Sequence, residues 1–78
     1  MSNKIVDNAA ALRGEGHFEE AIRLVESSLS QLDEISRQPA LLNALYAAKE
    51  GGLTDKAKEL AALIAEEDPD LPSIQEFL

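Results

Sequence analysis

The sequence predicts an all-α protein, and three observations support this fold class. Apolar residues recur at intervals of three and four along four separate stretches, which places them on one face of a helix. The strict alternation of apolar and polar residues that is typical of strands is absent from the sequence. Hydrophobic residues make up 45% of the chain but aromatic residues only 4%, so we expect a core of aliphatic side chains and alanine.

Two helices are expected in the N-terminal half. The first runs from about residue 3 to residue 13, and Gly14-Glu15-Gly16 ends it. The second runs from about residue 17 to residue 33, with Glu19 and Glu20 in its first turn, where exposed N–H groups favour negative charge. Its apolar stripe consists of Phe18, Ala21, Ile22, Val25, Leu29 and Leu32.

Two more helices are expected in the C-terminal half. The third opens near Pro39, because proline suits the first turn of a helix, where its missing N–H needs no partner. Gly51-Gly52 ends this helix. The fourth has Thr54 as its N-cap and ends before Asp68.

The tail, residues 71–78, is expected to form one or two helical turns. Ser73 and Glu76 have the spacing of a capping box, in which two side chains satisfy backbone N–H groups at a helix start. Such turns place Ile74, Phe77 and Leu78 on one side, where they can cover the fourth helix.

An internal repeat organises the four helices. A shift of 36 residues along the sequence superposes helix, glycine turn and helix on a second helix, glycine turn and helix. The identical pairs between the two repeat units are Ala11 and Ala47, Gly16 and Gly52, Ala21 and Ala57, and Leu24 and Leu60.

The repeat unit resembles the tetratricopeptide repeat (TPR) family, in which paired antiparallel helices recur about every 34 residues. The best match is the segment Gly16-His17-Phe18-Glu19-Glu20-Ala21-Ile22, which is similar to the family's turn, aromatic position and crossing alanine. Pro69 stands where the family has a terminating proline. The resemblance implies two antiparallel hairpins stacked as a right-handed repeat in a single domain, residues 1–78. Repeat one covers about residues 3–35, repeat two about residues 38–70, and a C-terminal capping helix residues 71–78.

Length and charge restrict the classes of partner. The chain has 78 residues, enough for one small core. It carries 15 acidic residues against 7 basic ones, a formal net charge of −8, and such an acidic field repels nucleic acid. With no cysteine, no secretory leader and no long apolar run, we expect a cytoplasmic protein without a membrane partner.

The sequence offers little support for catalysis. His17 is the only histidine, and a metal site there would need further ligands from elsewhere in the chain. The acidic segment Glu66-Glu67-Asp68-Pro69-Asp70 lacks the spacing and the central glycine of a calcium loop. Ser27, Ser28 and Ser30 lie in a helix without a nucleophile elbow. We therefore expect no enzyme activity, no catalytic residue, no cofactor and no metal.

The resemblance implies a binding groove, because the first helix of each TPR unit lines the concave side of the array. The groove residues form three equivalent pairs. Val6 and Leu42 give an apolar floor, Ala10 and Tyr46 leave a hollow beside one ring, and Arg13 and Lys49 place cations along one edge. An alternative remains open, in which Tyr46 covers the core and the two cations complement the C-terminal ends of their helices.

The expected function is binding of a protein or peptide client, as an adaptor or small chaperone. One alternative is a structural homodimerisation module, because Ile74, Phe77 and Leu78 concentrate apolar area at the end of the chain. The third and fourth helices and the tail also resemble small helical-repeat chaperones of type III secretion needle subunits, which implies a co-chaperone role as a further alternative.

Overall fold

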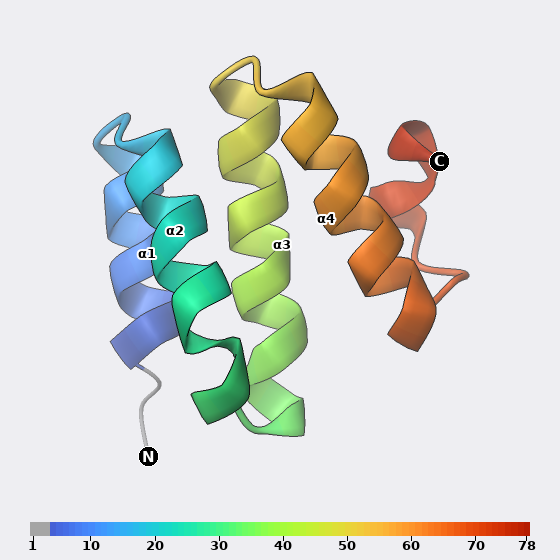
Figure 1. Cartoon of the computed structure of the whole chain (residues 1–78), viewed down its shortest axis with the longest axis horizontal. Coiled ribbons are helices and arrows are strands. Elements are labelled where there is room, and N and C mark those ends of the chain that lie inside the picture. Colours follow the sequence, from blue (N-terminus) through green and yellow to red (C-terminus); the bar gives the residue numbers. More distant parts are fainter. Residues whose placement is uncertain (1–3) are drawn as a thin grey trace.

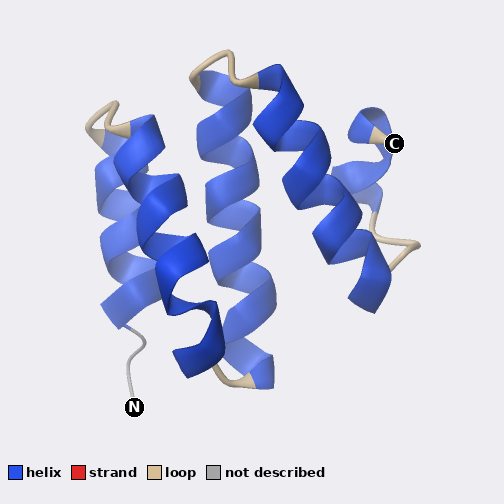
Figure 2. Cartoon of the chain, viewed as in Figure 1, coloured by secondary structure: helices blue, strands red, loops and turns tan. Residues whose placement is uncertain are grey.

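The computed structural model describes residues 4–78, and this part of the chain is all-helical, without a strand. Figure 2 shows helices joined by short loops. The four α-helices are α1 (Lys4–Gly14), α2 (Phe18–Ser28), α3 (Glu34–Glu50) and α4 (Thr54–Glu67). Two 3-10 helices complete the fold: η1 (Leu29–Gln31) follows α2, and η2 (Pro72–Phe77) lies near the C-terminus.

Successive α-helices run in opposite directions and alternate between two layers (Figure 1). The rear layer holds α1, α3 and η2, and the front layer holds α2 and α4. The longest helix, α3, packs against α1, α2 and α4, whereas η2 packs against α4. The central position of α3 makes it the element on which the other α-helices assemble.

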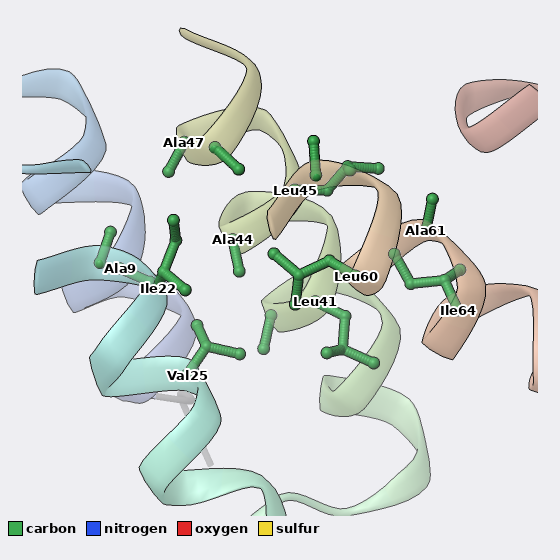
Figure 3. Close-up of a cluster of buried hydrophobic side chains, with 14 of the residues drawn as sticks. Ala9, Ile22, Val25, Leu41, Ala44, Leu45, Ala47, Leu60, Ala61 and Ile64 are labelled. Atoms are coloured by element: carbon green, nitrogen blue, oxygen red, sulfur yellow. The ribbon is translucent and has the colours of Figure 1, made fainter. Parts of the chain in front are cut away.

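Alanine and larger aliphatic residues make up the core, as the composition predicts. α3 contributes six buried residues, Ala40, Leu41, Ala44, Leu45, Ala47 and Ala48, whereas α1 contributes Ala9 alone. Small alanine side chains allow helix axes to approach closely, and larger aliphatic groups fill the spaces between them. Figure 3 shows Leu41 of α3 beside Leu60 of α4 in the centre of this cluster.

The turns after α1 and α3 are copies of each other at positions 36 residues apart. Gly16 has a φ of 84° and Gly52 a φ of 73°, a left-handed conformation that glycine adopts without steric cost. The next residue donates its N–H back across the turn in both cases. His17 N donates to the Leu12 carbonyl, and Leu53 N to the Ala48 carbonyl, each at 2.8 Å.

The predicted start of the third helix is wrong. α3 begins at Glu34, because the Asp33 carboxylate caps it by accepting the Ser36 N–H at 2.7 Å. Pro39 therefore lies inside the helix, where it removes the N–H that would bond the Ile35 carbonyl. Both residues are exposed, so water can satisfy that carbonyl. The second helix is also shorter than predicted, since α2 ends at Ser28 and continues only as η1.

Two predicted capping interactions are also wrong. Thr54 is the first residue of α4 rather than its N-cap, and Leu53 occupies the cap position without a side-chain hydrogen bond. In the tail, η2 starts after Leu71, and no side chain caps it. Glu76 instead forms an ion pair with Lys49 of α3, so the predicted capping box does not form. The predicted turns themselves are present as η2.

Candidate functional site

The predicted groove residues lie on α1 and α3, which pack together in the rear layer (Figure 1). Val6 and Leu42 are half-buried and pack against the core. Tyr46 is also half-buried, one turn beyond Leu42. Ala10 is exposed, and it lines an open surface hollow with Arg13, Gly14, Gly16, Phe18 and Glu50.

Arg13 joins α1 to α3 through three hydrogen bonds and a ring contact. Its Nε and Nη2 donate to the two carboxylate oxygens of Glu50 at 2.9 and 3.2 Å, a bidentate ion pair. Its Nη1 donates to Asn43 Oδ1 at 3.1 Å. The guanidinium carbon lies 5.1 Å from the centre of the Tyr46 ring, within the range of a cation–π contact.

Lys49 joins α3 to η2 in a similar way. Its Nζ lies 2.7 Å from Glu76 Oε1 and 5.8 Å from the centre of the Phe77 ring. The hydrogen bond to Glu76 and the negative charge of that carboxylate raise the pKa of Lys49 above its ordinary value of 10.5. Lys49 therefore stays protonated, and Glu76 balances its charge.

The two cation clusters follow one plan. Arg13 and Lys49 are equivalent under the 36-residue shift, and each lies in the last turn of its helix. Each of the two side chains contacts the next element of the rear layer, where it forms an ion pair with one carboxylate and lies near one aromatic ring. The two cations therefore link neighbouring elements of the rear layer, and a carboxylate neutralises the charge of each cation.

Sequence reasoning missed the partners of both cations. Glu50 and Glu76 form their ion pairs across 37 and 27 residues, respectively, so no local spacing indicates them. The aromatic residue Phe77 was assigned to self-association, whereas it is half-buried beneath Lys49. Only the placement of α1, α3 and η2 in one layer brings these side chains together.

The residues predicted for self-association separate in the structure. Ile74 is fully buried and belongs to the core of its own chain, so it presents no surface to a second copy. Leu78 is 63% exposed and remains open to solvent. The predicted apolar patch at the chain end is therefore reduced to Leu78 and the accessible part of Phe77.

Sequence reasoning also missed Ile35, which is 86% exposed, more than any other large hydrophobic residue among residues 4–78. The prediction placed Ile35 before the third helix, whereas it lies in the first turn of α3. Spacings of four, three and four residues put Ile35, Pro39, Leu42 and Tyr46 on one helix face. We call these four residues the α3 stripe.

The front layer has its own ion-pair link. The Lys56 Nζ atom of α4 lies 3.0 Å from Glu26 Oε2 of α2 and 3.1 Å from Glu59 Oε2 of its own helix. Hydrogen bonds to Glu26 and Glu59 raise the pKa of Lys56 above its ordinary value of 10.5.

His17 is exposed, with Nδ1 3.8 Å from Glu20 Oε1. Within residues 4–78, no three metal-ligating side chains gather at one point.

Comparison with protein-family models, with curated proteins and with solved structures finds no match to this chain. Among residues 4–78, none of the helices combines the length and the apolar character needed to cross a bilayer.

Proposed function

We propose that the chain is a non-catalytic, TPR-like helical-repeat module that binds a protein or peptide client, as an adaptor or small chaperone. The client contacts the rear face, which α1 and α3 form. The α3 stripe is the observation that carries the proposal, because it joins an 86% exposed isoleucine to a half-buried tyrosine along one helix face. Exposed apolar surface of this kind is typical of interaction sites.

The equivalence of the two hairpins supports the repeat interpretation. The turns at Gly16 and Gly52 use the same hydrogen bonds, and Arg13 and Lys49 use the same kind of partners. In this interpretation, η2 replaces the first helix of a third repeat in the rear layer. The side chain of Ile74 is buried in the core and holds η2 in place, so the tail acts as the cap of a two-repeat array.

The polar groups around the stripe favour binding through apolar contacts. Arg13 already donates hydrogen bonds to Glu50 and Asn43, and Lys49 already donates one to Glu76. A client carboxylate would have to displace these partners, whereas an apolar side chain can pack directly on the stripe. Tyr46 is suited to act as an anchor, since its ring is apolar and already held by Arg13.

Client capture from a cytoplasmic extract tests the proposal. The test variant combines Leu42→Glu with Tyr46→Ala, and the matched control combines Lys58→Ala with Ala62→Ser, at two exposed positions of α4. Circular dichroism confirms that both variants remain helical. We expect the control to retain a defined client and the test variant to lose it. Equal client recovery by both variants would remove the proposal.

Homodimerisation is the second candidate, and the exposed Leu78 beside Phe77 favours it. Sedimentation at several protein concentrations, with and without Leu78→Ser, distinguishes the two candidates. A monomer that still captures its client supports the first candidate, and a tight dimer lost in the variant supports the second. The co-chaperone role for a type III secretion needle subunit stays a prediction.

A further inference from the structure

We infer that the client segment held on the rear face is a basic amphipathic helix, with its apolar side on the α3 stripe and its basic residues near the start of α3. This inference rests on the proposed function and names the chemical class of the client. Three features support the inference: the length of the α3 stripe, the distribution of charge along the stripe, and the negative net charge of the chain.

The stripe has the length of a short helical ligand. From Ile35 to Tyr46 it covers about three helical turns, or roughly 16 Å at 1.5 Å per residue. The exposed isoleucine at one end and the tyrosine at the other give two anchor points, with Leu42 between them. A facing helix with apolar residues at intervals of three and four residues would place one side chain against each point.

Carboxylates gather at the Ile35 end of the stripe. Asp33 and Glu34 start α3, and both are exposed. The end of α4 lies beside them, because Arg37 Nε is 2.6 Å from Glu67 Oε1 and Gln38 Nε2 is 3.1 Å from Asp68 Oδ2. Arg37 pairs with Glu67, so Asp33, Glu34 and Asp68 leave the end of the molecule around the first turn of α3 negative.

The Tyr46 end of the stripe is balanced instead. Arg13 is paired with Glu50, and Lys49 is paired with Glu76. The α3 stripe therefore runs from a charge-balanced end at Tyr46, through an apolar centre, to an end that lies beside these carboxylates. A ligand with basic residues near one end of its apolar side matches this pattern, and the pattern fixes its direction along α3.

The net charge of the molecule favours this occupant over a second copy of the chain. The formal charge is −8, so two copies repel each other and a cationic segment is attracted from a distance. The second copy would also bring its own carboxylates to the acidic end. Because residues 4–78 contain no strand that a client could extend, a helix packed against helices is the favoured mode.

Four labelled peptides of equal length test the inference by fluorescence anisotropy. The first is a helix with leucines on one side and lysines on the other, and the second and third replace the lysines with glutamine or glutamate. The fourth is a scramble of the first that keeps its charge but loses its apolar side. We expect the first peptide to bind at least about tenfold more tightly than the glutamate and scrambled peptides.

Two protein variants locate the binding. Ile35→Ser should weaken the lysine peptide about five- to tenfold without changing stability, because the side chain is 86% exposed. Glu34→Gln combined with Asp33→Asn should weaken the lysine peptide but leave the glutamine peptide unchanged, because asparagine keeps the cap of α3. The variant with Lys58→Ala and Ala62→Ser on α4 is the matched control, and we expect it to bind as the wild type does.

Each remaining outcome overturns the inference. Equal binding of the lysine, glutamine and glutamate peptides, lost on Tyr46→Ala, would leave the rear face as a binding site but remove its preference for basic segments. Tight binding of the scrambled peptide, or indifference to Ile35→Ser, would show diffuse charge attraction. If no peptide binds, this class of client is wrong, and client capture from the extract still decides the proposed function separately.

Discussion

The two hairpins have equivalent sequences but unequal burial. Leu24 of α2 and Leu60 of α4 are the same residue 36 positions apart, yet Leu24 is half-buried and Leu60 is only 1% exposed. α1 contributes one residue to the core, whereas α3 contributes six. The second hairpin is packed between the first hairpin and η2, while the first has a neighbour on one side only. Position in the array therefore decides what each equivalent residue contributes to stability.

The matched leucines give the sharpest test of this difference. Leu60→Ala should destabilise the protein by about 2–5 kcal/mol, because it removes a fully buried side chain and leaves a cavity. Leu24→Ala should cost about 1 kcal/mol, because that side chain is already half in water. Urea denaturation of both variants measures the free energy of unfolding. Equal losses would contradict the asymmetry between the hairpins.

Glycines near the C-terminal ends of α1 and α3 give a second comparison, between one crowded position and one open position. A Cβ atom at Gly51 would lie 3.0 Å from both Cβ and Cδ2 of Phe18, so Gly51→Ala should destabilise by about 1 kcal/mol or more. A Cβ at Gly14 meets nothing within 4 Å, so Gly14→Ala should stabilise by about 0.5 kcal/mol. Urea midpoints decide the signs, and a stabilising effect of Gly51→Ala would contradict the close contact with Phe18.

The cap of α3 gives the smallest and most pH-dependent effect. The hydrogen bond from the Ser36 N–H lowers the pKa of Asp33 below its ordinary value of 3.8. Its ionised form is therefore favoured by folding, and this stability is present above pH 3.8 and lost as pH falls through the lowered pKa. Asp33→Ala should lower the Tm at neutral pH, and the difference from wild type should shrink in acid.

Asp33→Asn is the control for the cap. Asparagine caps helices about as well as aspartate but does not titrate, so the Tm at neutral pH should remain close to that of the wild type. Thermal unfolding followed by circular dichroism over a range of pH values compares the three proteins. A difference between Asp33→Ala and wild type that stays constant into acid would show that the carboxylate does not act as the cap.

Local patterns in the sequence predicted the number and order of the α-helices. Glycine pairs and apolar spacing are strong local signals, so the ends of α1 and α3 were placed correctly. The start of α3 was misplaced because Pro39 is a common first-turn residue, while Asp33 and Ser36 form the stronger cap. The error removed Ile35 from the helix and hid the first turn of the α3 stripe.

The candidate site was predicted as a set of residues but not as a set of contacts. The 36-residue shift paired Arg13 with Lys49 and Leu42 with Val6, and these residues do lie on two packed helices. The ion pairs with Glu50 and Glu76 could not be predicted, because they depend on which elements share a layer. Burial of Ile74 depends in the same way on where η2 docks.

The position of α3 between its neighbours has a consequence for folding. The α-helices pack largely on their neighbours along the chain, a topology of low contact order that typically folds within about a millisecond. The α3 stripe forms with its own helix, but α1 reaches α3 only after α2 has turned the chain back. During folding, the apolar anchors of the stripe are therefore present on α3 before the ion pair between Arg13 and Glu50 can form beside them.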